Sequence, residues 1–290
     1  MITFRRILFP VDFSKQDREA APFVKAIAER FHSEIILLHA AEFFPLGYGT
    51  PDAIVLEPMV DLESLMNSRR EQLNQHLSAD LAGLCVQRAL ELGDPAKEIA
   101  KYAHDQKVDL VMMPTHGYGP FRRFLLGSVT AKVLHDTDCP VWTGVHTDQL
   151  WSQNQYRWRR FLCAVDADPR DAPLLRWATQ FSTEQKAELQ VVHALPAAEP
   201  IPPGQEPASL RGFLLDTVEQ RISNLQSEAG TSLDILLRFG RVEHVVRNAA
   251  LAHEADLILI GRGVVQRMLG RLRSAAYAII REAPCPVISV

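Results

Sequence analysis

The sequence has no feature that would draw it to nucleic acid or insert it into a membrane. It carries 31 lysine and arginine residues against 35 aspartate and glutamate residues, for a net charge of −4. This balance argues against bulk attraction to a polyanion or to an anionic lipid surface. No apolar run approaches the roughly 18 residues of a membrane-spanning helix, and Pro10 and Asp12 interrupt the short one near the N-terminus. We therefore expect neither a nucleic-acid partner nor a membrane partner.

Cysteine is scarce and dispersed. The four cysteines form no C-x-x-C pair, which argues against a redox motif and against a zinc site. We predict that they are buried apolar residues of a reduced, cytoplasmic protein. They are Cys85, Cys139, Cys163 and Cys285. No Ser/His/Asp arrangement stands out either, so the sequence identifies no catalytic residue and no metal ligand.

What the sequence does contain is a second copy of itself. The segment "RRILFPVDFS" (5–14) corresponds to "RRFLCAVDAD" (159–168), which pairs Asp12 with Asp166 at an offset of 154 residues. Later, "GDPAKEIAKYAHDQKVDLVMM" aligns with "GRVEHVVRNAALAHEADLILI" at an offset of 147, and "DCPVWTGV" aligns with "PCPVISV". A period near half the chain predicts two similar domains rather than a solenoid of short repeats.

The join between the copies falls in the polar stretch "HTDQLWSQNQYRW", which has no apolar periodicity. We accordingly expect a first domain over residues 1–147, a linker over 148–157 and a second domain over 158–290.

Within each copy, short apolar runs alternate with longer amphipathic ones. The runs "IILL" and "LVMM" show no polar alternation, as expected of strands covered on both faces. Ser14 is placed to cap the first helix, in which Pro22 should cause a kink or mark a later start. Asp94 followed by Pro95 is a favoured helix start. The pattern predicts an α/β fold with a doubly wound, mostly parallel sheet in each half. The strands expected in the first copy are 5–11, 34–40, 84–91, 108–113 and 140–145.

Two loops would meet at the ligand-binding edge of such a sheet. Ligands bind beyond the carboxyl ends of strands where the strand order reverses, which for an order of 3-2-1-4-5 lies between strands one and four. The loops that leave these strands are "PVDFS" (10–14) and "PTHGYGPFRRFLLGS" (114–128). No lysine follows the glycines, so a P-loop is not indicated.

Three residues of these loops have chemistry that suits a nucleotide. Asp12 could accept hydrogen bonds from a base amino group or a ribose hydroxyl, or else it caps the helix that follows. Gly127 lets the backbone approach a phosphate closely. Ser128 would begin a helix whose free N–H groups favour an anion, although its hydroxyl could equally serve as the N-cap.

The spacing P-x-x-G-x9-G-S, from Pro114 through Gly117 to Gly127 and Ser128, resembles the ATP-binding motif G-x-x-G-x9-G-[ST] of the universal stress protein family. The flanking segments "ILFPVDFS", "LLHA", "GDPAKEIAKYA" and "GSVTAKVLHDTDCPV" are also similar to that family, and the resemblance covers nearly all of both halves. It implies two five-stranded parallel α/β domains of order 3-2-1-4-5, with helices on both faces. Their last strands would pair the domains into an intramolecular pseudo-dimer, and the chain could also form a homodimer.

The resemblance further implies ATP as the cofactor, with or without Mg²⁺, held as a signal with weak or no hydrolysis. Pro114 stands where the family has its first glycine, and a proline cannot supply an amide N–H there. The adenine base would lie against one set of residues and the ribose and phosphates against another. The first set is Pro10, Val11, Asp12 and Ala40, and the second is Gly117, Gly127, Ser128 and Val129.

The second copy departs from the motif. Gly261 aligns with Pro114, but one residue is missing from the loop, and Arg273 and Ser274 stand where the first copy has Gly127 and Ser128. We therefore expect a degenerate site in the second half.

These features favour a non-catalytic ATP-binding protein of stress response or signalling, with the nucleotide in the first domain. The alternative is a nucleotide-free structural or chaperone-like interaction protein of the same fold, which the proline at 114 and the degenerate second copy would suit. An ATP-dependent enzyme of the same broad fold group has little support, because no S-G-G-x-D-S, H-I-G-H or K-M-S-K-S stretch is present.

Overall fold

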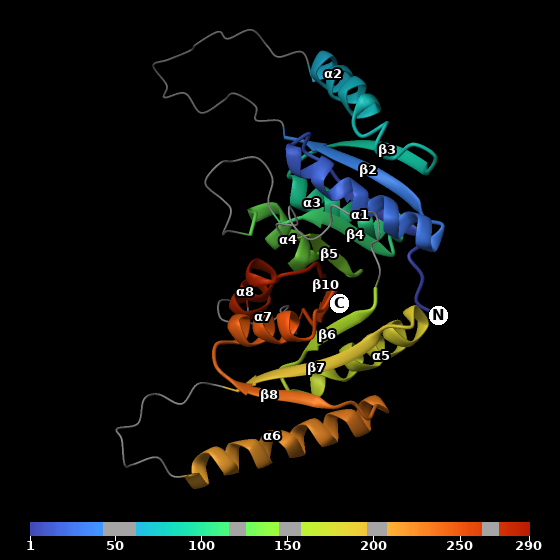
Figure 1. Ribbon diagram of the computed structural model, residues 1–290. Helices are drawn as coiled ribbons and strands as arrows, with labels where there is room; N and C mark the ends of the chain where they lie inside the picture. Colours follow the sequence, from blue (N-terminus) through green and yellow to red (C-terminus); the bar gives the residue numbers. More distant parts are fainter. Residues whose placement is uncertain (43–61, 116–125, 145–157, 196–207, 263–272) are drawn as a thin grey trace, which may run out of the picture. The chain divides into compact units, whose positions relative to one another are not determined.

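A computed structural model describes residues 1–42, 62–115, 126–144, 158–195, 208–262 and 273–290 (Figure 1). The contacts within the chain group into two compact units. The N-terminal unit holds Phe4–Phe121 and Gly127–Cys139, and the C-terminal unit holds Pro140–Val290 together with Met1–Thr3 and Arg122–Leu126.

The N-terminal unit alternates strands with helices. All of its strands are parallel and lie in the order β3-β2-β1-β4. Its elements are β1 (Arg6–Pro10), α1 (Lys15–Phe31), β2 (Glu34–Ala41), α2 (Leu62–Gln75), β3 (Cys85–Leu92), α3 (Pro95–Asp105), β4 (Leu110–Pro114) and α4 (Ser128–Asp136).

The C-terminal unit repeats this arrangement and adds one strand. Its strands lie in the order β5-β10-β9-β6-β7-β8, with β5 antiparallel to β10 and the other pairs parallel. Figure 1 shows α7 and α8 side by side on its sheet. Its elements are β5 (Val141–Gly144), β6 (Arg160–Ala164), the 3-10 turn η1 (Pro169–Asp171), α5 (Ala172–Gln185), β7 (Glu188–Leu195), α6 (Ala208–Ala229), β8 (Ile235–Phe239), α7 (Val242–Ala252), β9 (Leu257–Ile260), α8 (Arg273–Glu282) and β10 (Val287–Ser289).

The predicted fold class is confirmed: each half is an α/β unit with a parallel sheet that is wound in both directions. The strands β8-β7-β6-β9-β10 show the full order 3-2-1-4-5, and β3-β2-β1-β4 show its first four places. Right-handed crossovers place the helices of the two winding directions on opposite faces of the sheet. The apolar runs that suggested two-sided burial are indeed buried along β1, β2, β4 and β9.

The two predicted helix starts differ in how well they agree with the structure. Asp94 caps α3 as predicted, because its Oδ1 accepts the amide of Lys97 at 3.1 Å. Helix α1, in contrast, begins at Lys15 and continues through Pro22, so the alternative of a later start is wrong. Ala21 and Val24 on either side of the proline are buried, and packing of this apolar face sustains the helix where one backbone hydrogen bond is missing.

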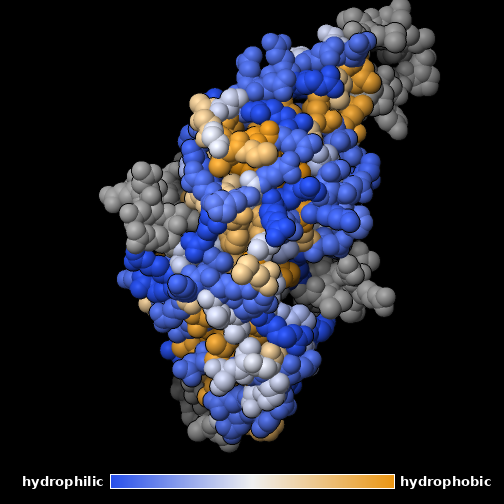
Figure 2. Space-filling view, turned by 90° about the vertical axis from the view of Figure 1, so that its right-hand side faces the viewer, coloured by the Kyte–Doolittle hydropathy of each residue, from blue (hydrophilic) through white to orange (hydrophobic). Residues whose placement is uncertain are grey.

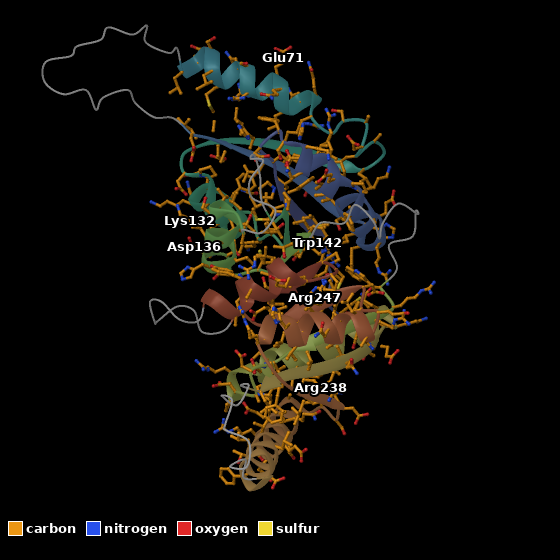
Figure 3. The ribbon with its side chains drawn as sticks, turned by 60° about the vertical axis from the view of Figure 1, so that its left-hand side comes forward. Glu71, Lys132, Asp136, Trp142, Arg238 and Arg247 are labelled. Atoms are coloured by element: carbon orange, nitrogen blue, oxygen red, sulfur yellow. The ribbon has the colours of Figure 1, made fainter. Side chains whose placement is uncertain are left out.

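The last strand of the first repeat pairs with the last strand of the second. Trp142 lies opposite Ile288 and is fully buried (Figure 3). The hydroxyl of Thr143 donates to the carbonyl of Val287 at 3.4 Å, and that of Ser289 donates to the carbonyl of Val141 at 3.3 Å. In this antiparallel pairing, the β5–β10 seam, each strand is the hydrogen-bonded partner of the other. Neither strand is therefore left with an exposed edge on that side.

The prediction that all four cysteines are buried is wrong for two of them. Cys163 and Cys285 are buried, but Cys85 is exposed at the start of the edge strand β3, and Cys139 is half-buried. Residue type predicts burial on average, whereas position in the sheet decides it here. Burial raises the pKa of the Cys163 and Cys285 thiols far above the usual range, so both are unreactive in the folded protein.

The face of the molecule shown in Figure 2 is mainly hydrophilic, with apolar residues in separate small areas. Among the described residues, the large apolar side chains that remain exposed are dispersed over different elements. They are Met1, Leu62, Leu92, Phe213 and Leu251. None of the described helices combines the length and the apolar character needed to span a membrane.

Candidate functional site

The carboxyl ends of β1, β2 and β4 meet at one edge of the N-terminal sheet. Strand β1 lies between the other two, with Pro10 beside Leu38 of β2 and Leu8 beside Val111 of β4. The chain leaves β1 towards β2 on one side and later returns to β4 on the other. The order of the strands therefore reverses between β1 and β4, where parallel sheets bind ligands.

The loop after β1 presents Asp12 at this edge. The buried Val11 donates its amide to the carbonyl of Leu38 at 2.8 Å, which continues the sheet for one more residue. Asp12 is exposed, and its Oδ1 accepts the amide of Ser14 at 3.0 Å. Asp12 therefore closes a turn before α1 and is not the N-cap, which is Ser14. The hydroxyl of Ser14 is buried and makes no capping bond.

Phe13 adopts the left-handed backbone conformation, with φ at 64°. Its ring packs at 4.3 Å from the ring of His39 and meets that of His76 edge-on at 5.2 Å. The guanidinium of Arg69 lies 6.0 Å from the ring centre. A bulky residue with positive φ is costly, so these ring contacts help to hold the turn that directs Asp12.

Two buried titratable groups lie behind the loop. Nδ1 of His39 donates to the carbonyl of Val11 at 2.8 Å, and burial lowers the pKa of this imidazole. Asp17 is 1% exposed and accepts the amide of Asp12 at 3.2 Å, and burial raises the pKa of its carboxyl group. Burial thus favours the neutral form of His39, and hydrogen-bond donors favour the charged form of Asp17 against the effect of burial.

The second loop brings the start of α4 to the same edge. The N-cap of α4 is Gly127 and the first helical residue is Ser128, so the alternative that Ser128 is the cap is wrong by one position. Among the described residues, no side chain caps this helix. The exposed Ser128 and the half-buried Val129 therefore present helix-terminal amides without a side-chain acceptor from that part of the chain, an arrangement that favours an anion.

Two other groups in this loop are already engaged. The amide of Gly127 donates to the carbonyl of Thr115 at 2.8 Å, and the hydroxyl of Thr130 donates to the carbonyl of Pro114 at 3.2 Å. Gly127 has φ −60° and ψ 145°, a conformation open to any residue. What Gly127 offers at this position is therefore the absence of a side chain. Its backbone conformation is an ordinary one, and its amide is already hydrogen-bonded.

Of the nine residues nominated from the sequence, the structure places eight at this one edge. Pro10 ends β1, Val11 and Asp12 follow it, and Ala40 lies near the end of β2. Pro114 ends β4, and Gly127, Ser128 and Val129 open α4. Gly117 lies outside the described residues.

The C-terminal unit repeats the loop after the first strand in detail. The amide of Asp166 donates to Asp171 at 2.8 Å, Ala167 has φ at 56°, and Nδ1 of His193 donates to the carbonyl of Val165 at 2.8 Å. The cavity at this edge, lined among others by Asp166, Asp171 and Arg262, measures about 40 Å³. That is far below the roughly 300 Å³ of small ligand pockets. The degenerate second copy thus keeps the turn but offers little space among its described residues.

Sequence reasoning missed the residues that support the loop from behind. Asp17 and His39 carried a usable signal, because Asp171 and His193 occupy the same places in the second repeat at the same offset of 154 residues. His76 had none: it has no counterpart in the loop contacts of the described part of the second repeat, and it meets Asp17 across 59 residues of sequence.

The sequence model of the universal stress protein family matches residues 3–143 and again 157–290. Universal stress protein MJ0577 of Methanocaldococcus jannaschii is 29% identical over 152 residues, which are 48% of this chain and 94% of that protein. Universal stress protein MJ0531 of the same organism is 31% identical over 139 residues, or 48% of this chain and 80% of that one. A universal stress protein from Archaeoglobus fulgidus superposes with a TM-score of 0.66 at 21% identity, covering 100% of this chain and 97% of that chain.

Proposed function

Because the chain belongs to the universal stress protein family, we propose that its N-terminal unit binds ATP at the edge where β1 and β4 diverge. The observation that carries this proposal is the pairing of an exposed carboxylate, Asp12, with the uncapped start of α4 at a single sheet edge. The first can accept hydrogen bonds from a sugar or a base amino group, and the second can accept an anion. The sugar or base of a nucleotide and its phosphates would therefore each have a complementary group at this edge.

Each nominated residue has a role in this proposal. The base lies against Pro10 and Val11, with Ala40 at its far side, and Asp12 receives hydrogen bonds from the ribose or the base. The amides of Ser128 and Val129 hold phosphate oxygens, and the missing side chain of Gly127 lets them approach. Gly117 is included because it matches the second glycine of the family's ATP-binding motif. Pro114 contributes no amide, and its carbonyl already accepts from Thr130.

The proposed activity is non-catalytic: bound ATP, with or without Mg²⁺, biases the conformation or partner choice of a cytoplasmic stress-response or signalling protein. Each repeat would act as a domain, over residues 1–147 and 158–290 with a linker at 148–157. The pairing of β5 with β10 supports a pseudo-dimer of the two domains within one chain, and a homodimer of chains is a further proposal.

Calorimetric titration with ATP tests the site through a matched pair of variants. Asp12→Asn changes the carboxylate proposed to contact the nucleotide, and Asp166→Asn makes the same change at the equivalent turn of the C-terminal unit. We expect Asp12→Asn to weaken ATP binding about tenfold, because its amide oxygen still accepts a hydrogen bond but lacks the charge that strengthens it. Asp166→Asn should leave the affinity unchanged.

The titration also separates the alternatives. Equal affinities for the two variants would refute the assignment of Asp12, and a wild-type protein that gives no heat of binding would favour a nucleotide-free interaction protein. That second function has its own support, because Pro114 and the engaged amide of Gly127 together remove two donors from the loop. Release of phosphate during the titration would identify an enzyme in place of a switch.

A further inference from the structure

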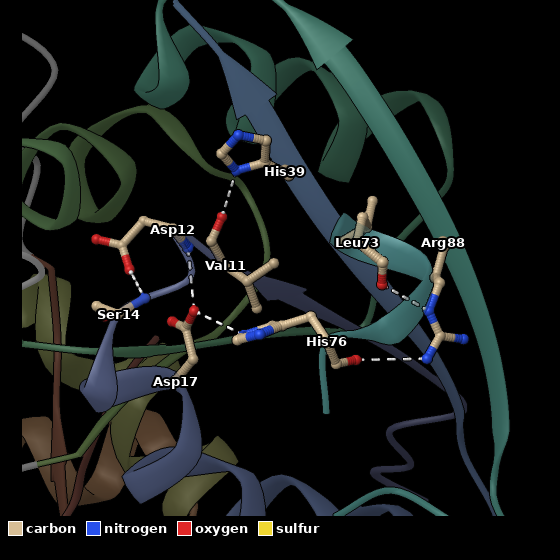
Figure 4. A network of polar contacts seen from close by, with 8 residues as sticks. All are labelled: Val11, Asp12, Ser14, Asp17, His39, Leu73, His76 and Arg88. Carbon is tan, nitrogen blue, oxygen red and sulfur yellow. Dashed lines mark hydrogen bonds and ion pairs between the residues drawn. The ribbon is translucent and has the colours of Figure 1, made fainter. Parts of the chain in front are cut away.

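One oxygen of Asp17 connects two segments of the N-terminal unit. Oδ2 of this buried carboxylate accepts the amide of Asp12 at 3.2 Å and also lies 3.0 Å from Nε2 of His76 (Figure 4). An ionised carboxylate can only accept hydrogen bonds, so Nε2 of His76 must carry the proton. Asp17 therefore joins the loop after β1 to the residue that follows α2.

His76 is itself fixed from the next strand. Arg88 of β3 donates from Nε to the carbonyl of Leu73 at 2.9 Å and from Nη2 to the carbonyl of His76 at 3.4 Å (Figure 4). The His76 side chain is 8% exposed and packs edge-on against Phe13. The backbone of His76 is thus held from β3 by a contact outside the loop, while its imidazole packs against Phe13 of the loop it supports.

The C-terminal unit provides an internal comparison. Asp171, the counterpart of Asp17, accepts the amide of Asp166 at 2.8 Å and takes its second hydrogen bond from the amide of Asp168 at 3.2 Å. Among the described residues, the same turn forms there without a histidine donor to this carboxylate. The carboxylate is therefore what shapes the turn, and His76 is the additional donor that the buried Asp17 needs in the N-terminal unit.

Few charged and titratable groups of the described residues surround the pair. Burial acts most strongly on the pKa of Asp17 and raises it, the hydrogen bond from His76 lowers it, and the charge of Asp12 raises it. His39 from β2 and Arg69 from α2 contact the same Phe13 ring, and Arg88 approaches from β3. A buried carboxylate in these surroundings is stable only when its donors are in place.

We propose that Asp17 and His76 are positioning residues of the nucleotide loop: Asp17 fixes the backbone of Asp12, and His76 keeps Asp17 in place. The inference rests on the proposed function for the identity of the ligand. Neither residue touches the nucleotide, and both act by holding the Asp12 carboxylate in the geometry that receives it.

The positioning role is tested first without nucleotide, by NMR amide exchange. In Asp17→Ala the amide of Asp12 loses its acceptor and should exchange at least about tenfold faster. The amide of Asp166 in the same molecule is the internal control and should keep its rate. Asp17→Asn offers one oxygen that can accept from both donors, so it should restore the wild-type rate. An unchanged Asp12 rate in Asp17→Ala would overturn the proposal.

The coupling to His76 is tested with ATP as the probe. Asp17→Ala should weaken binding by about tenfold or more, whereas Asp17→Asn should stay within about threefold of wild type. Asp171→Ala, the matched change in the other unit, should leave the affinity unaltered. His76→Ala should weaken binding in the wild-type background but much less in the Asp17→Asn background, because no charge is then left unpaired.

The two proposals fail in different ways. If the wild-type protein does not bind ATP while Asp17→Ala still accelerates exchange at Asp12, the proposed function falls and the positioning role stands. If ATP binds equally well to wild type and Asp17→Ala, the positioning role falls and the proposed function stands. Equal effects of His76→Ala in both backgrounds would reduce His76 to a packing residue and overturn its part of the proposal.

Discussion

Burial of Asp17 makes the stability of the N-terminal unit depend on pH in a definite direction. Its pKa in the folded protein is raised above the 3.8 of an unperturbed aspartate. A raised pKa means that the folded state binds the proton more tightly, so this stabilising contribution is complete below pH 3.8 and is lost as the pH rises through the folded-state pKa.

Asp17→Asn cannot lose a proton and lacks this dependence. The free energy of unfolding of the variant relative to wild type should therefore increase as the pH rises from about 4 towards neutrality, by at most about 1.4 kcal/mol per pH unit. Urea denaturation of both proteins across this range measures the difference. A difference that is constant or falls with pH would contradict the burial of a charged Asp17.

Thiol reactivity provides a second test at the scale of single residues. Cys85 is exposed, whereas Cys163 and Cys285 are buried and their pKa values are raised by burial. A maleimide added to the native protein should modify Cys85 readily and should reach the two buried thiols only after denaturant is added. Peptide mapping identifies the sites, and rapid labelling of Cys163 in the folded protein would contradict the packing of β6.

At the scale of elements, the helix starts differ in how they are capped, and the difference is measurable. Asp94 accepts the amide of Lys97 and pairs with Lys132 of α4 at 3.1 Å. Its counterpart Arg241 starts α7 with no side-chain capping bond. Asp94→Ala should lower the free energy of unfolding by about 1 kcal/mol, and Asp94→Asn, which keeps a capping oxygen, should change it by less than about 0.5 kcal/mol. Equal losses for the two variants would show that the cap contributes nothing.

The elements themselves were largely predictable, because their signals are local. The expected strand at 108–113 is observed at Leu110–Pro114, and the cap at Asp94 is where Pro95 indicated it. Ser128 begins α4 as expected, but its alternative role as the N-cap falls to Gly127, whose amide donates to the carbonyl of Thr115 just after β4. Contacts of that kind join distant parts of the chain, and local patterns do not encode them. The support of the loop by His76 was missed for the same reason.

At the scale of the whole molecule, the internal duplication indicated both the fold and the candidate site, because two copies show which features each half retains. The turn after the first strand is the same in both units, down to the left-handed residue and the histidine behind it. The copies differ at the start of the later helix, where Gly127 in one corresponds to Arg273 in the other. We therefore attribute the proposed difference in nucleotide binding to the second loop.

The seam between β5 and β10 predicts a large effect from one residue of the C-terminal unit. Trp142 is fully buried there, whereas Phe213 on α6 is 65% exposed. Trp142→Ala should lower the free energy of unfolding by about 3–5 kcal/mol, the usual cost of removing a buried large aromatic side chain. Phe213→Ala, which removes an exposed aromatic ring, should change it by less than about 0.5 kcal/mol. Similar values for the two variants would mean that the seam is not packed as described.

The central claim, one nucleotide site in the N-terminal unit, is tested most directly by native mass spectrometry of the protein titrated with ATP. We predict a single added ATP per chain for the wild type and none for Gly127→Arg, which copies the residue of the second repeat. The conformation of Gly127 admits any side chain, so this variant should fold, and circular dichroism would verify it. Two ATP molecules per chain, or an undiminished ATP adduct in folded Gly127→Arg, would contradict the account.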